Sequence, residues 1–380
     1  MHPTTDITPY GDADVARVLR DLFGNRELID AIGTYRLGRW YRLFRPLLRG
    51  RVSAELRKSF SGVDNVRQFQ EAIEPYLARI LRVSTESFTV SGLEHLSPAK
   101  SYLFLSNHRD IAMDPAFVNW ALYNNGFETV RIAIGDNLVR RAYIGDLMRL
   151  NKSFIVRRNL SGPREMLKAY SELSSYIRES IETGHSVWIA HREGRAKDGI
   201  DSTDPAILKM LAMAGKAREE SFAQALSALH IVPVSISYEF DPCAPMKARE
   251  LRLRREHGDY TKAENEDLVS ITTGMLGWKG RVHLHFGQVI EVSETLDPQQ
   301  LAGHIDQSIH AGQRIFDTSR LADQLLKGEP IRDGFLPDVV ARFKALLETT
   351  PDVDRTQLLE IYANPLRQFT AHQQSQLESI

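Results

Sequence analysis

Between residues 86 and 292, short β-rich runs alternate regularly with longer helical stretches, and this pattern limits the possible folds more than any other feature. The runs are rich in Val, Ile and aromatic residues. The stretches between them, such as 163–183 and 205–227, have apolar residues at helical spacing. Strands that alternate with helices predict an α/β fold: a mixed, largely parallel sheet flanked by helices. The predicted strands are FTVSG (88–92), SYLFLS (101–106), VRIAI (130–134), SFIVR (153–157), SVWIA (186–190), HIVPVSISY (230–238) and RVHLHFG (281–287).

Helical sequence flanks this alternating segment on both sides. Residues 11–83 hold many Leu, Arg, Ala and Glu at helical spacing and few β-branched runs. Residues 297–380 return to the helical pattern and end in a polar tail, HQQSQLESI, of a kind that is often disordered. We therefore predict three parts: a helical N-terminal region over 1–85, a sheet-bearing domain over 86–296 and a helical C-terminal extension over 297–380.

Charge and cysteine content exclude several classes of protein. Lys+Arg 48 against Asp+Glu 49 gives a net charge of -1, so the whole chain has no general attraction to nucleic acid. The single cysteine, Cys243, cannot form an internal disulfide and suits a reducing compartment. The opening residues lack the basic start and apolar core of a signal peptide, and no stretch approaches 18 consecutive apolar residues. We therefore expect a cytoplasmic protein whose membrane contact is peripheral.

The basic and aromatic stretch YRLGRWYRLFRPLLR (35–49) is the candidate for such contact. As one helix it would separate apolar side chains from arginines, the pattern of a helix that lies on an anionic membrane. The alternative is a helix packed on the protein core with a solvated arginine face, and Pro46 would kink either one. The apolar face would hold Leu37, Trp40, Tyr41, Phe44 and Leu48, and the basic face Arg36, Arg39, Arg42, Arg45 and Arg49.

The stretch SNHRDIAMDP (106–115) carries the strongest chemical signal. It follows a predicted strand and opens a predicted helix. A histidine is the common general base near neutral pH, and it needs a partner, usually a carboxylate, on its other ring nitrogen. Asp114 can meet His108 across the strand-to-helix turn, and Asp110 is the rival partner. The alternative is a helix start capped by Asn107 or Asp110 beside an incidental histidine.

Further polar groups follow other predicted strands, where ligands of such sheets collect. Arg157 and Arg158 end the strand SFIVR and form a natural clamp for a phosphate or carboxylate. After SVWIA, the loop HREGRAKDG places an acid, a flexible backbone and a cation together as Glu193, Gly194 and Arg195. These motifs predict a site at one end of the sheet.

Two further strand features leave alternatives open. Pro233 lies inside an apolar run and predicts a sheet edge, a bulge or a strand end. His283 and His285 alternate along their strand, so they share one face and form either a partial metal site or part of a half-exposed surface. The charged stretch 246–268 predicts a solvated helical insertion. This stretch forms either a solvated face or a docking site for an acidic carrier protein. The arginines that would dock the carrier are Arg249, Arg252, Arg254 and Arg255.

Taken in order, the motifs resemble those of the glycerolipid acyltransferases, which include lysophosphatidate and glycerol-3-phosphate acyltransferases. NHRDIAMD is similar to the family's histidine–aspartate motif, and GDNL through SFIVRR is similar to its second block. REGRAKDG is similar to the third block, built around Glu-Gly and a following Arg, and IVPVSISYE to the fourth, an apolar strand that carries a proline. The resemblance covers roughly residues 86–292 and implies the acyltransferase fold for the domain over 86–296.

The resemblance also implies a reaction. In the family, an acyl thioester on coenzyme A or acyl carrier protein is transferred to a hydroxyl of a glycerol phosphate, without a metal or other cofactor. His108 would take the acceptor proton and Asp114 or Asp110 would hold the imidazole. Arg157 and Arg195 would bind the acceptor phosphate, and Glu193 would bind an acceptor hydroxyl or fix those arginines. Asn107 or a nearby backbone N–H would help the oxyanion, and an apolar tunnel near Pro233 would take the acyl chain. The implied substrate contacts are Asn107, Arg109, Arg157, Arg158, Glu193, Gly194, Arg195 and Pro233.

Two departures from the family pattern affect the site. The family usually places four residues between histidine and aspartate, whereas five separate His108 from Asp114. Either the turn bulges by one residue or Asp110 takes over the role. The third block is also one residue short, because Arg195 follows Gly194 directly. Each chemical group is still present, so the resemblance implies a divergent subfamily.

Partners and rival functions follow from these features. We expect acyl-CoA or acyl carrier protein, a phospholipid precursor and the inner face of the membrane as partners, with no nucleic acid. The acceptor stays open between lysophosphatidate, glycerol 3-phosphate and another lyso-lipid. The rival classes are a non-catalytic peripheral lipid-binding protein and a soluble thioester hydrolase.

Overall fold

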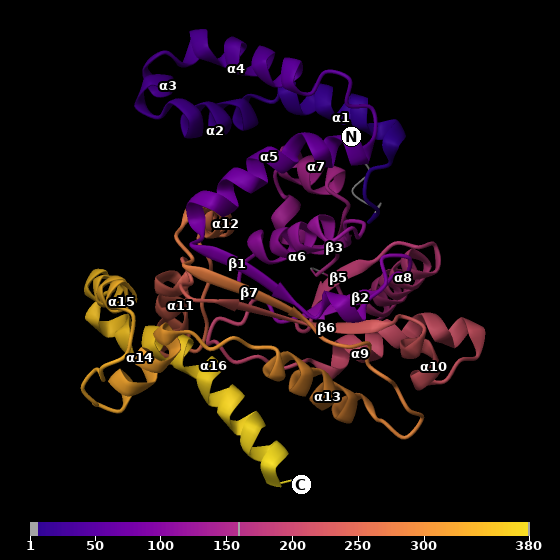
Figure 1. Cartoon of the computed structure of the whole chain (residues 1–380). Helices are drawn as coiled ribbons and strands as arrows, with labels where there is room; N and C mark the ends of the chain where they lie inside the picture. The colour runs from indigo at the N-terminus through magenta and orange to yellow at the C-terminus, as the bar shows by residue number, and fades with distance from the viewer. Residues whose placement is uncertain (1–6, 159, 379–380) are drawn as a thin grey trace. The chain divides into compact units, whose positions relative to one another are not determined.

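The computed structural model describes residues 7–158 and 160–378 (Figure 1). The chain forms two compact units, each made of separate segments. The first unit joins Met1–Arg79 to Arg131–Met166, and the second joins Ile80–Val130 to Leu167–Ile380. The three-part division expected from the sequence stays a prediction.

All seven predicted strands are present, close to their expected bounds. In the second unit, β1 pairs with β7, and β2 with both β5 and β6, in parallel; β6 pairs with β7 antiparallel. In the first unit, β3 and β4 are parallel. The predicted α/β class with mixed, largely parallel strands is confirmed. The strands are β1 (Ser87–Ser91), β2 (Leu103–Ser106), β3 (Arg131–Gly135), β4 (Ser153–Val156), β5 (Val187–Ala190), β6 (Ile231–Tyr238) and β7 (Arg281–Phe286).

The strand β6 has neighbours on both sides, so the expectation that Pro233 marks a sheet edge is wrong. Pro233 lies opposite Leu105 of β2, and its carbonyl accepts a hydrogen bond from the Gly287 N–H at 2.8 Å. Gly287 follows the last residue of β7. Because proline has no N–H, Pro233 cannot donate a hydrogen bond back to Gly287. This missing bond falls just beyond the last residue of β7. The strand that ends here is therefore β7.

Helices account for most of the remaining chain. The predicted helix over 163–183 is present as α8, whereas the stretch 205–227 is broken into α9, a 3₁₀ segment and α10. Among the described residues, no helix is both long and apolar enough to cross a membrane. The helices are α1 (Asp12–Gly24), α2 (Arg26–Leu37), α3 (Arg39–Leu43), α4 (Arg45–Ser59), α5 (Val66–Ser84), α6 (Met113–Asn124), α7 (Ala142–Leu150), α8 (Pro163–Glu182), α9 (Pro205–Leu211), α10 (Phe222–Ser227), α11 (Ala244–His257), α12 (Glu266–Leu276), α13 (Pro298–Ala311), α14 (Asp317–Leu326), α15 (Pro337–Thr349) and α16 (Asp352–Glu378).

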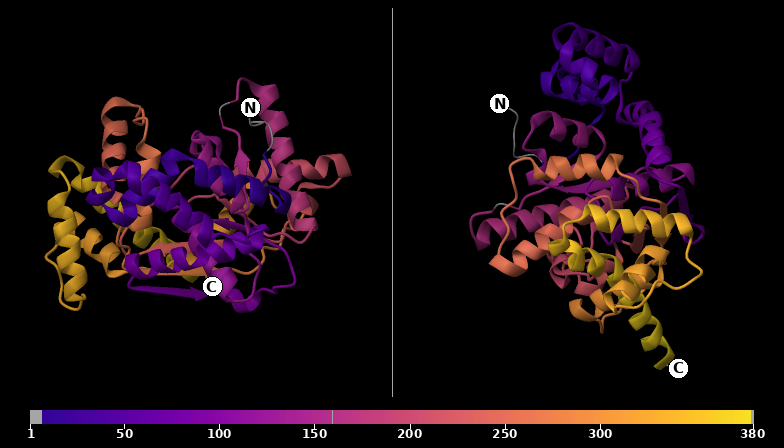
Figure 2. Two further views of the ribbon diagram at one scale, coloured as in Figure 1. Left: turned by 90° about the horizontal axis from the view of Figure 1, so that it is seen from above. Right: turned by 90° about the vertical axis from the view of Figure 1, so that its left-hand side faces the viewer.

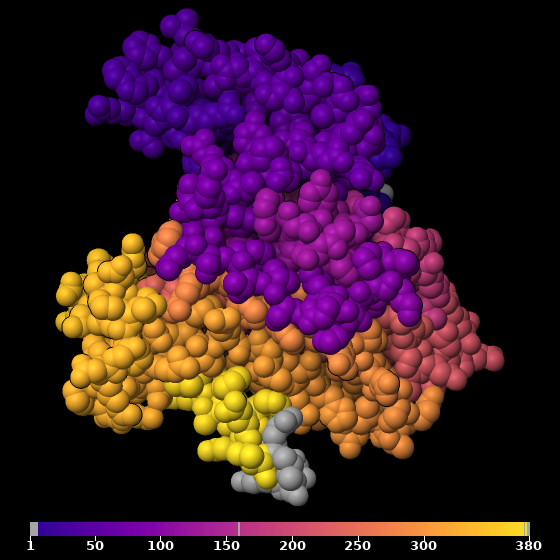
Figure 3. Space-filling view, in the orientation of Figure 1, coloured from indigo at the N-terminus to yellow at the C-terminus, as the bar shows by residue number. Residues whose placement is uncertain are grey.

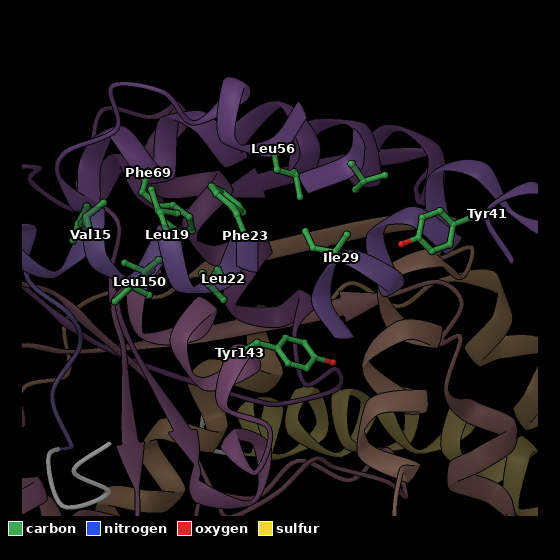
Figure 4. Packing of buried hydrophobic residues seen from close by; sticks show 13 residues of the cluster. Val15, Leu19, Leu22, Phe23, Ile29, Tyr41, Leu56, Phe69, Tyr143 and Leu150 are labelled. Carbon is green, nitrogen blue, oxygen red and sulfur yellow. The ribbon is translucent and has the colours of Figure 1, made fainter. Parts of the chain in front are cut away.

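The core of the first unit comes from amphipathic helices (Figure 4). Leu19, Leu22 and Phe23 of α1 are buried against Phe69 of α5 and Leu150 of α7. Phe60 joins the cluster with its ring 5.2 Å from that of Phe23. The helical spacing of these apolar residues supplies one continuous buried face, as the sequence of 11–83 predicts.

The stretch 35–49 is not one helix, so the predicted separation into an apolar and a basic face is wrong. The chain breaks at Gly38, whose φ of 56° lies in the left-handed region that favours glycine, and again before α4, where Pro46 occupies the first turn. These breaks turn Tyr41 into the core, 1 % exposed, and leave Trp40 and Leu47 58 % and 78 % exposed.

Asp30 holds this broken segment together. Its carboxylate accepts hydrogen bonds from the Tyr41 hydroxyl at 2.8 Å and from the guanidinium groups of Arg45 and Arg49. These partners, the arginines first, hold the pKa of the Asp30 carboxyl well below its usual range. Two of the five arginines assigned to a membrane face therefore bind a carboxylate of the protein itself.

The C-terminal helices α14, α15 and α16 pack with α11 in the second unit around Leu321, Phe343 and Tyr362. The polar tail expected to be disordered continues α16 through Glu378, and its last turns extend away from the rest of this unit (Figure 2). The arginines considered for carrier-protein docking are largely paired here. Arg252 binds Asp354 at 2.6 Å, and Arg255 binds Glu360 at 3.3 Å.

A buried histidine follows β5. His191 is 0 % exposed, and its backbone N–H donates to the Ser106 carbonyl of β2 at 2.8 Å. Its Nδ1 lies 3.4 Å from the Thr203 hydroxyl, and its Nε2 has no partner among the described residues. Burial lowers the pKa of His191 to about 4, so the ring is neutral in the folded protein at pH 7.

We predict that this burial makes stability fall on acidification. Between pH 6.5 and about 4 the unfolded chain binds a proton at His191 and the folded chain does not, so stability is complete above that window and decreases as pH falls through it. The loss is about 3 kcal/mol at most. Urea unfolding at pH 7 and pH 4.5 should show a smaller pH effect for His191→Gln than for wild type. His257→Gln, at an exposed position, is the control, and an equal pH effect in all three proteins would contradict the assignment.

Candidate active site

The loops that follow β2, β5 and β6 in the second unit meet at one edge of the sheet, because these strands run parallel. The first loop carries His108 and leads into α6, whose first turn contains Asp114. His108 Nδ1 lies 2.7 Å from Asp114 Oδ2. The His108 side chain is 14 % exposed and that of Asp114 is fully buried.

Asp114 is bound by four hydrogen-bond donors. Its Oδ2 accepts from His108 and from the backbone N–H groups of Arg109 (2.6 Å) and Asp110 (2.9 Å), and its Oδ1 accepts from the Tyr238 hydroxyl (2.7 Å). Burial opposes ionisation, but the bonds from His108, the backbone and Tyr238 outweigh it and keep the pKa of Asp114 below its usual value. The ionised carboxylate therefore orients an Nδ1–H tautomer of His108.

The donors also explain how the loop accommodates five residues between histidine and aspartate. The backbone N–H groups of Arg109 and Asp110 both turn toward Asp114 Oδ2, so the five-residue turn closes around the carboxylate. Of the two arrangements considered from the sequence, the structure has the one in which Asp114 pairs with His108.

Asp110 makes a different set of bonds. Its Oδ1 accepts from the N–H groups of Ala112 (3.0 Å) and Met113 (2.8 Å), so it caps the start of α6. It makes no hydrogen bond to His108, and the alternative that Asp110 orients the imidazole is not supported. Burial and the nearby Asp114 charge raise the pKa of Asp110. Gly274 of α12 packs against this carboxyl so closely that a Cβ there would lie 1.8 Å from Oδ2.

His108 presents its second nitrogen without an internal partner: Nε2 has no hydrogen bond to any described residue. The ring lies edge-on to the indole of Trp188 in β5, with centroids 5.5 Å apart. Trp188 is 2 % exposed, and its Nε1–H has no acceptor among the described residues. A neutral imidazole in this state has one free acceptor nitrogen, as a general base requires.

Asn107 has no free N–H group to donate to an oxyanion. Its Nδ2 donates to Asp201 Oδ2 at 2.9 Å and to the Ile236 carbonyl at 3.1 Å, while its Oδ1 accepts from the Ile236 N–H at 2.7 Å. The side chain is fully buried and both amide hydrogens are used. The expected substrate contact from Asn107 is corrected: this residue ties the histidine loop to β6.

Arg109 is also largely occupied within the protein. Its Nη2 donates to Asp201 Oδ2 at 2.6 Å, and its backbone carbonyl accepts from Lys247 Nζ at 2.7 Å. Its Nη1 is buried without a partner among the described residues. Direct contact of Arg109 with a substrate stays a prediction.

The loop after β5 places the third-block residues. Gly194 has φ 77°, a left-handed conformation that favours glycine, and Glu193 beside it is exposed. Arg195 is partly buried, and its Nη1 donates to the Ser270 hydroxyl of α12 at 2.6 Å. The Ala196 N–H in the same loop donates to the His108 carbonyl at 2.8 Å. This hydrogen bond links the loop after β5 to the backbone at His108.

The remaining predicted contacts are the paired arginines and Pro233. Arg157 and Arg158 follow β4 in the first unit, where the Arg158 N–H donates to Asp136 at 3.1 Å; their role toward substrate stays a prediction. The apolar tunnel expected near Pro233 stays a prediction; the cavity beside Gly287 is the one described nearby. The lining of that cavity mixes apolar residues (Val289, Ile290 and Ala311) with polar ones: His285, Gln288, Glu291, His304 and Ser308.

The histidines of β7 have ordinary hydrogen-bond partners. His283 lies 2.8 Å from the Thr89 hydroxyl, and His285 lies 2.9 Å from the Ser91 hydroxyl. Within residues 7–158 and 160–378 no cluster of three or more His, Cys, Asp or Glu side chains could hold a metal ion. Cys243 is buried, and burial raises the pKa of its thiol to about 11, so it is no nucleophile at neutral pH.

Three residues of the site were not found from the sequence: Tyr238, Trp188 and Asp201. Tyr238 is the next-to-last residue of the fourth motif, IVPVSISYE, and Trp188 lies in the strand before the third, so both had a positional signal. Burial and Asp114 raise the pKa of Tyr238 well above its usual value, so its hydroxyl stays a donor. Asp201 follows the third motif, and only the fold brings it to the histidine loop.

Comparisons with known proteins agree with these motifs. The family model described as Acyltransferase matches residues 87–237. Glycerol-3-phosphate acyltransferase of Ectopseudomonas mendocina (strain ymp) is 24% identical over 216 residues. The match covers 56% of this chain and 24% of that protein, so it spans about a quarter of the relative's length.

Among solved structures, the 1-acyl-sn-glycerophosphate (LPA) acyltransferase PlsC from Thermotoga maritima aligns with 81% of this chain and 100% of its own, with a TM-score of 0.36 and 13% sequence identity. The likeness to acyltransferases comes from the matched segment and from the motifs inside it. Residues 87–237 therefore match the acyltransferase family, and this part of the chain is similar to a glycerolipid acyltransferase.

Proposed function

We propose that this protein transfers a fatty acyl group from an acyl thioester to a hydroxyl of lysophosphatidate or glycerol 3-phosphate, with His108 as general base. The observation that carries the proposal is the His108–Asp114 hydrogen bond of 2.7 Å, which leaves His108 Nε2 free to accept. Asp114 receives four donors, so its geometry is fixed before any substrate binds.

The proposed reaction is a direct transfer of the acyl group from sulfur to oxygen. The acceptor O–H gives its proton to His108 Nε2 while the oxygen attacks the thioester carbonyl. Asp114 stabilises the imidazolium that forms. The tetrahedral intermediate then collapses, the carbon–sulfur bond breaks, and the imidazolium returns the proton to the departing thiolate. The products are the ester and the free thiol.

Arg195 is our candidate for binding the acceptor phosphate within the second unit. Ser270 holds its guanidinium, and no carboxylate of the described residues forms an ion pair with it. Acyl-CoA is the donor to test first. Arg252, Arg254 and Arg255 are engaged by acidic side chains of the protein, which leaves less free positive charge for an acidic carrier protein.

The transfer reaction gives the first prediction. Thiol release from a long-chain acyl-CoA should require lysophosphatidate or glycerol 3-phosphate, and His108→Ala should lower kcat by about a hundred- to ten-thousand-fold. Asp114→Asn should give a loss of similar order, because the wrong tautomer is then favoured. Asp110→Asn should reduce activity less than Asp114→Asn. Thiol release without an acceptor would instead identify a hydrolase, and lipid binding with no release would identify a binding protein.

Tyr238 gives a separate prediction. Tyr238→Phe removes one of four donors to Asp114 and keeps the ring that packs on Phe117. We expect kcat/KM to fall about ten-fold, the size expected for one hydrogen bond to a charged group. The loss of activity in strong acid, where Asp114 itself takes a proton, should begin at a higher pH, because the Asp114 carboxylate loses a bond that lowers its pKa. An unchanged profile would show that Tyr238 does not act through Asp114.

We also propose that the protein binds the membrane surface through the exposed side chains of α2–α4 (Figure 3). Large apolar side chains there are unusually exposed for a folded chain, and exposed arginines lie among them. Singly exposed apolar residues are common, but a cluster within one segment favours a binding surface. The cluster consists of Tyr35, Leu37, Trp40, Leu43, Phe44 and Leu47.

Vesicle sedimentation tests this surface. Trp40→Ser combined with Leu47→Ser should reduce binding to vesicles with anionic lipid by at least about ten-fold, because two buried apolar side chains contribute about 1.5–3 kcal/mol each. Leu336→Ser with Val353→Ser, also exposed, is the matched control and should bind like wild type. Equal binding by both double variants would exclude α2–α4 as the membrane surface. His108→Ala should leave vesicle binding unchanged.

A further inference from the structure

Asp201 is a buried carboxylate on which three separate parts of the second unit converge. It is 1 % exposed, and its Oδ2 accepts hydrogen bonds from Asn107 Nδ2 (2.9 Å), Arg109 Nη2 (2.6 Å) and Gln313 Nε2 (2.9 Å). Its Oδ1 has no partner among the described residues. All three donors therefore bind the same carboxylate oxygen, Oδ2.

The two donors from the first motif flank the histidine. Asn107 and Arg109 are the immediate neighbours of His108, and both side chains bind the same oxygen of Asp201. The His108 carbonyl is held as well, by the Ala196 N–H of the loop that carries Asp201. The backbone around His108 is thus fixed from both sides by one loop, while Asp114 fixes the ring.

The C-terminal helices hold Asp201 itself. Gln368 of α16 accepts from the Asp201 N–H and donates to its carbonyl, both at 2.8 Å. Gln313, just after α13, binds the carboxylate, and His310 Nε2 lies 3.2 Å from the Asp201 carbonyl. Residues 297–380, for which the motifs give no role, therefore anchor the loop that anchors the histidine.

We propose that Asp201 is a positioning residue, which sets the His108–Asp114 geometry through Asn107 and Arg109, and that α13 and α16 complete the active site by holding Asp201. This inference rests on the proposed function for its kinetic effect. It assigns a role in the reaction to the C-terminal helices as well as to the sheet-bearing domain.

Kinetics of Asp201 variants test the proposal. Asp201→Ala should lower kcat about ten- to hundred-fold and change the KM for acyl-CoA less than about three-fold, since a small displacement of a reacting group can cost this much. Asp201→Asn keeps one accepting oxygen and should recover part of the loss. Asp204→Ala, which removes the cap of α9 in the same loop, is the matched control and should retain wild-type kcat.

A double-mutant cycle separates positioning from general destabilisation. In a His108→Ala background, Asp201→Ala should lower the residual rate less than about three-fold, because its effect acts through His108. An equal loss in both backgrounds would overturn the proposal. If Asp201→Ala does not fold, the same cycle with Asp201→Asn or Gln313→Leu decides, and additive losses in those variants would overturn it equally.

A spectroscopic readout keeps this test separate from the proposed reaction. In protein labelled with ¹⁵N-histidine, wild type and Asp204→Ala should show a protected His108 Nδ1–H signal bonded to Asp114. Asp201→Ala, and Asp201→Asn to a lesser extent, should broaden or lose it. An unchanged signal would overturn the positioning role. If wild type transfers no acyl group to either acceptor, the proposed function fails while this signal still tests the geometry.

Discussion

The site depends on one buried carboxylate that is ionised away from water. Asp114 is charged because four donors compensate its burial: the His108 ring, the Tyr238 hydroxyl and the backbone N–H groups of Arg109 and Asp110. Two of these donors come from the turn itself, so the turn cannot change shape without exposing a charge to an apolar surrounding. The loop with its extra residue is therefore determined by the carboxylate, and the orientation of His108 follows from it.

Much of the fold could be predicted from the sequence, because strand patterns are local. Every predicted strand is present, and parallel pairing brings the ends of β2, β5 and β6 to one edge, as strands alternating with helices imply. The His108–Asp114 pairing was also within reach of the sequence, since both residues lie in one turn. The sequence could not decide against Asp110, because that choice depends on which backbone N–H groups donate to each carboxylate.

Other features could not be predicted because they depend on contacts between distant segments. Pro233 lies in an interior strand, and only the early end of β7 makes that position tolerable. The basic stretch 35–49 is divided at Gly38 and before Pro46, and Asp30 then recruits Arg45 and Arg49. Helical periodicity alone cannot reveal such partners.

Asp201 shows the same limit within the site. It lies far along the chain from both His108 and the C-terminal helices, and neither spacing nor residue type marks it. Its importance comes from burial and from donors supplied by two distant segments, Asn107 and Arg109 on one side and Gln313 on the other. A motif identifies the groups that react, whereas the groups that hold them in place are found only from the fold.

The most direct test of the central claim is the reactivity of His108 Nε2. Diethylpyrocarbonate should modify His108, and loss of acyl transfer should follow its modification one for one by mass spectrometry. Lysophosphatidate or glycerol 3-phosphate should slow both together, because the acceptor hydroxyl occupies the same nitrogen. Full modification of His108 with transfer intact would contradict the account.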